Sequence, residues 1–112
     1  MLAVGMPLIT NTPKLPYYAV IFTSLRTGGD AGYAAMSQRM RELAAQQPGF
    51  LGIESARQDI GITVSYWRDL ESIKAWKTNI EHREAQRLGR EIWYSSYQVR
   101  IAKIEHEYGF DK

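Results

Sequence analysis

Residues 48–77 constrain the fold of this chain more than any other segment, because they carry several structural signals with almost no spare residues between them. Pro48 and Gly49 end whatever precedes them, and a Gln-Asp-Ile-Gly turn at 58–61 separates two runs rich in β-branched and aromatic residues. Asp69 is a favourable N-cap for a following helix. The segment therefore predicts a β-hairpin that leads into a helix, with strands at 50–57 and 62–67 and a helix that continues to 77.

The rest of the chain supplies a strand and a helix before this segment and a strand after it. The expected elements are a strand at 17–24, an amphipathic helix from Asp30 to 47, a helical break near 78–81, renewed helix-forming composition at 83–90 and a final strand at 93–104. The order β-α-β-β-α-β is typical of a ferredoxin-like α+β fold, in which an antiparallel sheet carries both helices on one face. We expect one domain at 17–106, an extended N-terminal arm at 1–16 and a C-terminal tail at 107–112.

The predicted strands have apolar or aromatic side chains on both faces, although helices can cover only one face. In residues 17–24 one face carries Tyr17, Ala19 and Ile21, and the other carries Tyr18, Val20 and Phe22. The simplest cover for the second face is the same sheet of a second copy, related by a twofold axis. The sequence thus predicts a homodimer with a lined cavity between its two sheets.

Composition excludes several classes of function. The chain has 112 residues, a net charge of +2 and no cysteine, so nucleic acid is a disfavoured partner, and thiolate catalysis and cysteine-bound metals are excluded. No apolar run reaches membrane-spanning length, and the first ten residues lack the basic start of a signal peptide. We expect a cytoplasmic protein without membrane contact. No metal-ligand spacing or glycine-rich phosphate loop is present, so no metal is expected.

Four short segments resemble the antibiotic biosynthesis monooxygenase superfamily, and within it small bacterial members. They are Pro-Gly-Phe-Leu-Gly-Ile-Glu at 48–54, Val-Ser-Tyr-Trp-Arg-Asp at 64–69, Ile-Lys-Ala-Trp-Lys at 73–77 and His-Arg-Glu-Ala-Gln-Arg-Leu-Gly at 82–89. The resemblance spans about residues 17–106 and implies the dimeric α/β barrel. Some members oxygenate a bound phenol or enol with no metal or flavin, because the ionised substrate itself reduces dioxygen. Other members degrade haem, and others have no demonstrated chemistry.

The haem-degrading branch of that superfamily has an Asn on the first strand, a Trp on the second helix and an iron-binding His about three helical turns further on. This chain has Trp76, but the tenth position beyond it is Gln86, and the strand at 17–24 has no Asn. The resemblance therefore disfavours haem cleavage and leaves haem binding through His82 as the third alternative. No cofactor is expected.

Candidate catalytic residues are His82 and Arg100. A neutral His82 imidazole could take a phenolic proton, and Arg100, which stands within an apolar strand, could stabilise an enolate or superoxide anion. The alternative readings are a surface or helix-capping histidine and a strand arginine that pairs with a carboxylate.

Candidate substrate-binding residues are aromatic or amide side chains on the same predicted elements. Trp67 and Trp76 could form a wall for a planar substrate, Tyr66 and Tyr94 could hydrogen-bond its hydroxyl group, and Asn79 could orient a carbonyl. The alternatives are core packing for the four aromatic residues and a helix break for Asn79.

The resemblance implies a monooxygenase-type oxidoreductase that oxidises or binds a small aromatic or polycyclic molecule, phenol-like or quinone-like, without a cofactor. Two alternatives stay open. One is a barrel of the same shape that binds a small ligand, or serves a stress response, without turnover. The other is haem binding or degradation.

Overall fold

The computed structural model describes residues 8–12 and 14–112, so residues 1–7 and 13 of the predicted arm lie outside the described residues. Residues 8–12 and 14–16 form neither helix nor strand. The elements are β1 (Tyr17–Arg26), α1 (Tyr33–Ala45), β2 (Phe50–Arg57), β3 (Gly61–Trp67), α2 (Leu70–Thr78), α3 (Ile80–Leu88), a π-helical turn η1 (Gly89–Trp93) and β4 (Tyr94–Ile104).

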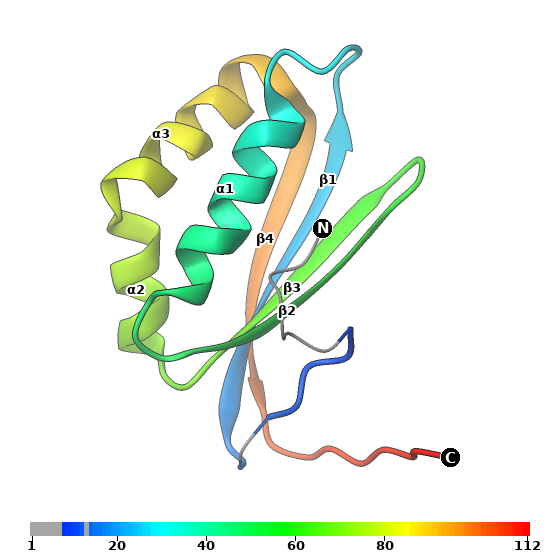
Figure 1. Cartoon of the computed structure of the whole chain (residues 1–112), viewed down its shortest axis with the longest axis vertical. Coiled ribbons are helices and arrows are strands. Elements are labelled where there is room, and N and C mark those ends of the chain that lie inside the picture. Colours follow the sequence, from blue (N-terminus) through cyan, green and yellow to red (C-terminus); the bar gives the residue numbers. More distant parts are fainter. Residues whose placement is uncertain (1–7, 13) are drawn as a thin grey trace.

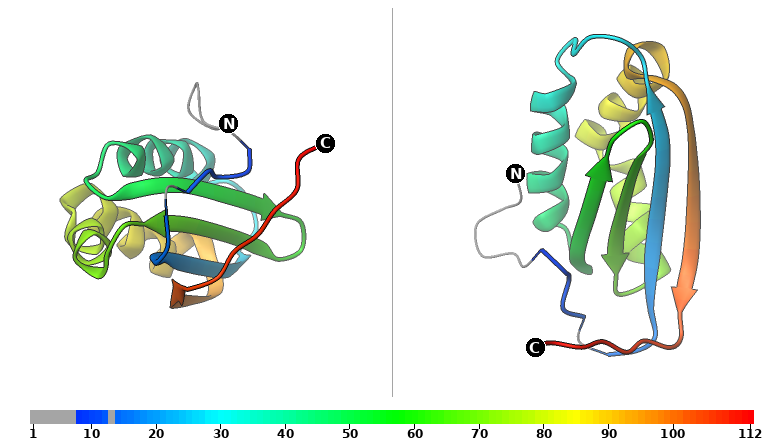
Figure 2. Two further views of the ribbon diagram at one scale, coloured as in Figure 1. Left: turned by 90° about the horizontal axis from the view of Figure 1, so that it is seen from below. Right: turned by 90° about the vertical axis from the view of Figure 1, so that its right-hand side faces the viewer.

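The four strands form one antiparallel sheet in the order β2-β3-β1-β4. The helices α1, α2 and α3 all lie on one face of this sheet (Figures 1 and 2). This arrangement confirms the predicted ferredoxin-like α+β fold. We call the side of the sheet that carries the helices the helix-facing side, and the opposite side the outer face.

The hairpin of β2 and β3 follows the local signals in the sequence, and β2 begins and ends at the predicted residues. Gly49 precedes it with φ of 84°, a left-handed conformation that glycine adopts without steric cost. A side chain at Gly49 would also collide with Ser72 on α2. The carbonyl of Gly49 accepts a hydrogen bond from the Arg68 nitrogen at 2.7 Å, which ties the start of β2 to the end of β3.

A side chain that precedes each of α1, α2 and α3 accepts a hydrogen bond from the first turn of that helix. Asp30 accepts hydrogen bonds from the backbone nitrogens of Gly32 and Ala34, although α1 itself starts at Tyr33, later than the sequence predicts. The predicted break in the second helix is confirmed. It lies at Asn79, which ends α2 and caps α3.

The core lies between the sheet and the helices, around Trp67, which is fully buried. Ala44 from α1 and Ile73 from α2 are buried against it. Partly buried side chains that pack on this cluster are Tyr18, Val20, Phe50 and Trp76. Because Val20 belongs to this cluster, the alternate residues of β1 on either side of it, such as Ile21, point to the outer face.

The chain's own ends cover part of the outer face. The backbone nitrogen of Thr10 donates to Glu54 at 3.1 Å, and the Glu107 carboxylate in the tail accepts from Thr12 at 2.9 Å and from the Tyr17 hydroxyl at 3.0 Å. The arm and the tail meet at one end of the sheet (Figure 2). Ile62, further along the outer face, stays exposed.

Candidate functional site

The break between α2 and α3 places His82 beside the core. Asp69 starts α2 by accepting a hydrogen bond from the Ser72 nitrogen at 2.8 Å. Asn79 then starts α3, since its side-chain oxygen accepts from the nitrogens of Glu81 and His82 at 3.0 and 3.2 Å. Asn79 therefore uses its acceptor oxygen as a helix cap, which agrees with the helix-break alternative for this residue.

Trp67, Trp76 and His82 form a continuous aromatic stack that runs from the core to the first turn of α3. The ring centroids of Trp67 and Trp76 are 6.2 Å apart with an interplanar angle of 26°, and those of Trp76 and His82 are 4.1 Å apart with an angle of 12°. The indole nitrogen of Trp67 donates to the Ser65 hydroxyl at 2.9 Å, so its one polar group is satisfied. The structure thus brings together three of the seven predicted site residues.

The hydrogen bond of His82 defines how its imidazole carries a proton. Its Nδ1 lies 2.8 Å from the carbonyl oxygen of Trp76, and a carbonyl can only accept, so Nδ1 carries the hydrogen in the neutral ring. Nε2 then keeps a lone pair. No buried side-chain nitrogen or oxygen in the described part of the chain lacks a partner, and Nε2 bonds to none of the described residues, so it reaches solvent.

Burial lowers the pKa of His82 below its ordinary value, and the hydrogen bond to the Trp76 carbonyl opposes this shift only in part. A neutral imidazole is therefore the favoured form near neutral pH. With Nδ1 fixed and Nε2 unprotonated, His82 has the arrangement of a general base.

An uncovered apolar strip of β4 lies on the same side of the sheet as this stack. Tyr97, Val99 and Ile101 are in register with Ser24, Phe22 and Val20 of β1, so their side chains lie on the helix-facing side. Their exposed fractions are 36%, 44% and 54%, which are high for apolar side chains beside helices. The helix α3 packs instead against α1, α2 and η1. The strip offers apolar surface to a ligand within reach of the helices.

Tyr94 lies at the other end of this strip, in a cluster of aromatic rings. Its ring contacts Phe22, with centroids 5.2 Å apart, and Tyr33 of α1, with centroids 5.7 Å apart. Its hydroxyl donates to the Tyr33 hydroxyl at 3.3 Å. Burial, followed by the Tyr33 hydrogen bond, raises the pKa of Tyr94, so it stays a hydrogen-bond donor at neutral pH.

Tyr66 and Arg100 lie on the outer face, away from His82. Arg100 is in register with Ile21, and Tyr66 with Ala19. The Tyr66 hydroxyl donates to Glu54 at 2.7 Å, and burial together with this carboxylate raises its pKa. A single chain therefore does not bring these two predicted site residues to the stack that contains His82.

Phe22 and Tyr33 belong to the helix-facing cluster but were not among the predicted site residues. Phe22 was recognisable from the alternation of β1 once one face was assigned to the helices. Tyr33 lies in the helix that the sequence predicts from Asp30, and nothing local to it indicates a neighbour on β4.

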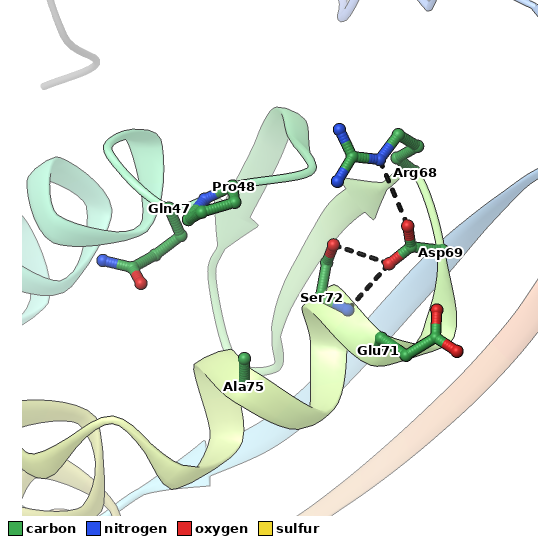
Figure 3. Close-up of a pocket in the computed structure, with 7 residues that line it drawn as sticks. All are labelled: Gln47, Pro48, Arg68, Asp69, Glu71, Ser72 and Ala75. Atoms are coloured by element: carbon green, nitrogen blue, oxygen red, sulfur yellow. Dashed lines mark hydrogen bonds and ion pairs between the residues drawn. The ribbon is translucent and has the colours of Figure 1, made fainter.

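A shallow hollow of about 200 Å³ lies at the start of α2, and no predicted site residue lines it (Figure 3). Its volume is below the ~300 Å³ at which ligand pockets usually begin. Asp69 accepts there from Ser72 and pairs with Arg68 at 3.1 Å, so the hollow's polar groups hold the helix start. Within 8–12 and 14–112, no cluster of three or more side chains could hold a metal ion, and no helix could span a membrane.

Comparisons with known proteins agree with this fold. The sequence pattern of the family described as antibiotic biosynthesis monooxygenase matches residues 16–88. The uncharacterized protein YqjZ of Bacillus subtilis (strain 168) is 48% identical over 104 residues, which cover 91% of each chain.

Among solved structures, a mutant form of SnoaB, a cofactor-independent oxygenase from Streptomyces nogalater, has a TM-score of 0.71 at 13% identity and covers 81% of this chain and 95% of its own. Rv0793 from Mycobacterium tuberculosis has a TM-score of 0.73 at 11% identity and covers 85% of this chain and 100% of its own. At these identities the structures share the fold alone. The family match and the B. subtilis relative show that this chain belongs to the antibiotic biosynthesis monooxygenase family.

Proposed function

We propose that this protein binds a small aromatic or polycyclic phenol on the helix-facing side of its sheet and oxygenates it without a cofactor, with His82 as the general base. One observation carries the proposal. His82 is stacked on Trp76 and bonded through Nδ1 to its carbonyl, so that Nε2 is an oriented base that reaches solvent. The description of SnoaB as a cofactor-independent oxygenase supports the same class of reaction on a shared fold.

The proposed reaction begins when Nε2 of His82 takes the proton of a phenol or enol. The resulting anion transfers one electron to dioxygen, and the substrate radical and superoxide then combine into a peroxide anion on a ring carbon. This anion takes the proton back from His82 and becomes a hydroperoxide. Loss of water leaves a carbonyl group there. For a substrate in equilibrium with its keto form the balance is R₂CH₂ + O₂ → R₂C=O + H₂O. Dioxygen accepts four electrons from the substrate, one oxygen atom enters the product and the other leaves as water.

A second candidate is a barrel of this family that binds a ligand without turnover. The observation that favours it is the filling of the space beside His82 by the chain's own indole rings, since Trp67 is fully buried and Trp76 packs on it. Under this alternative the exposed strip of β4 would bind the ligand and His82 would act only in packing.

We further propose that two copies of the chain associate through the outer faces of their sheets. The part of this face that the arm and tail leave open includes Ile62, which is exposed. Val64 lies two residues further along β3, and Arg100 is in register with Ile21, the partner of Val64 on β1. Burial of such apolar surface is the usual driving force for a symmetric dimer. In this arrangement Arg100 would lie at the interface. Sedimentation that shows a folded monomer at micromolar concentration would contradict the dimer.

The test of the oxygenase proposal starts with a thermal-shift screen of phenols, quinones, flavins and haemin, followed by oxygen-uptake assays on every compound that stabilises the protein. We expect His82→Gln to lower the rate with a phenol by about 100-fold or more, because a positioned base contributes about that much. His106→Gln, which removes the chain's other histidine, an exposed residue just beyond β4, is the matched control and should leave the rate unchanged.

Three outcomes separate the candidates. Full activity in His82→Gln would remove this residue from the chemistry. Saturable binding of phenols with no oxygen uptake would favour the non-catalytic barrel. If His82→Gln loses oxygen uptake but keeps its ligand affinity and its circular dichroism spectrum, the assignment of His82 as the general base is supported.

A further inference from the structure

Two arginines near one end of the helix-facing side have no carboxylate partner among the described residues. Arg26, at the end of β1, donates to the carbonyl oxygens of Trp93 and Gly29 at 2.9 Å each. Arg57, at the end of β2, donates to the carbonyl oxygen and the hydroxyl of Ser24. Three other arginines pair with acidic side chains: Arg39, Arg68 and Arg87. Asp30 follows Arg26 in the chain, but its carboxylate holds the start of α1.

The side chain of Arg57 crosses β3 to reach Ser24, and Gly61 leaves room for it. Arg57 is in register with Gly61, which is in register with Ser24 on the next strand. A Cβ atom at Gly61 would occupy the position of the Arg57 guanidinium. Any other residue at this position would therefore push the guanidinium away from β1.

The two arginines border the same group of tyrosine rings, Arg26 directly and Arg57 through Ser24. The Arg26 guanidinium carbon lies 3.6 Å from the ring centroid of Tyr33, whose hydroxyl accepts from Tyr94. Both guanidinium groups also act on Tyr94, since each partly offsets the rise in its pKa that burial causes. Ser24 is in register with Tyr97, whose ring centroid is 6.0 Å from that of Tyr94.

We call Arg26, Arg57, Tyr33 and Tyr94 the arginine cluster. It adjoins the exposed apolar strip of β4. The end of β1 and the start of β4, which carry Arg26 and Tyr94, lie near the start of α1, which carries Tyr33 (Figure 1). Arg57 belongs to β2 and reaches Ser24 across β3. From Val20, beside the core, to Ser24 at the cluster, four residues of β1 span about 13 Å at about 3.3 Å per residue. An elongated aromatic ligand on this strip would therefore place one end at the cluster.

The geometry points to the arginine cluster as a binding site for a carboxylate group carried by the aromatic ligand. The substrates of this protein would then be polycyclic phenols that bear an acidic group. Guanidinium groups bind carboxylates with paired hydrogen bonds, and a neighbouring tyrosine hydroxyl can add a donor. The inference rests on the proposed function only in taking the helix-facing side as the ligand surface. It does not require turnover.

The test compares anthraquinone-2-carboxylate with anthraquinone-2-carboxamide, which are similar in shape, differ in charge and are already oxidised. Isothermal titration calorimetry measures both affinities for the wild type, Arg57→Gln, Gly61→Ala and the control Arg83→Gln, which removes an exposed positive charge on α3. We expect the wild type to prefer the carboxylate by about tenfold, which corresponds to about 1.4 kcal/mol. The preference should be lost in Arg57→Gln, reduced in Gly61→Ala and kept in Arg83→Gln.

The outcomes distinguish this inference from the proposed function. Equal binding of both compounds to the wild type, or a preference that persists in Arg57→Gln, would overturn the carboxylate site and leave the oxygenase proposal standing. Binding of neither compound would overturn the carboxylate site, whereas the oxygenase proposal is tested separately by the screen of phenols. A third outcome is that inorganic phosphate raises the melting temperature of the wild type but not of Arg57→Gln, and that neither anthraquinone binds. This result would assign the cluster to a free anion and overturn the carboxylate assignment.

Discussion

The pH dependence of stability tests whether His82 is held neutral in the folded protein. The pKa of His82 lies below its ordinary value of 6.5 because burial disfavours the charged ring. Between the folded-state pKa and about pH 6.5, the unfolded chain therefore binds more protons than the folded chain. The free energy of unfolding rises with pH across this window and falls as the solution becomes more acidic. His82→Gln removes this contribution, and the glutamine amide can still donate to the Trp76 carbonyl.

The size of the effect has an upper limit set by the ordinary pKa. If the folded protein kept His82 unprotonated over the whole range, the free energy of unfolding would be at most about 1.4 kcal/mol lower at about pH 5.5 than at about pH 7.5 because of this residue. The observed loss should be a part of this limit, because the Trp76 hydrogen bond and the remaining solvent contact of Nε2 moderate the shift.

Urea unfolding followed by far-ultraviolet circular dichroism at the two pH values measures the effect. The wild type should lose more stability on acidification than His82→Gln, and the difference between the two isolates this residue from the carboxylates that also titrate. His106→Gln should behave as the wild type does. An equal loss in the wild type and His82→Gln, or a larger loss in His82→Gln, would refute the view that burial keeps this imidazole neutral and would weaken its assignment as the base.

Three further substitutions test the fold around this site by urea unfolding. Gly49→Ala should lower the free energy of unfolding by about 1–2 kcal/mol from left-handed backbone strain alone, and the collision with Ser72 should lower it further. The control Gly28→Ala should change the free energy of unfolding by less than about 0.5 kcal/mol. Equal effects of the two substitutions would contradict the proposed strain at Gly49. Asn79→Ala should cost about 1 kcal/mol through loss of the α3 cap, with most of it restored by Asn79→Ser, and no loss would show that the cap is dispensable. Trp67→Ala should cost about 3–5 kcal/mol, since the fully buried indole is the centre of the core, and a loss below about 1 kcal/mol would place that centre elsewhere.

Local chemistry made much of the fold predictable from the sequence. The bounds of β2, the cap at Asp69 and the break at Asn79 each depend on residues within a few positions of one another, so the signals are complete in a short stretch. The topology followed from the order of these elements. The start of α1 was misplaced because Asp30 bonds to the nitrogens of Gly32 and Ala34 across a turn that precedes the helix.

The composition of the site could be predicted only in part, because strand alternation assigns residues to two faces without saying which face the helices cover. The residue types available for chemistry, with His82, Trp67 and Trp76 among them, can be read from the sequence alone. The packing of the helices on the sheet directs Val20 of β1 toward the core, and through the strand registers this places Arg100 and Tyr66 on the outer face. The arginine cluster likewise depends on contacts between residues far apart in the chain, and such contacts have no local signal.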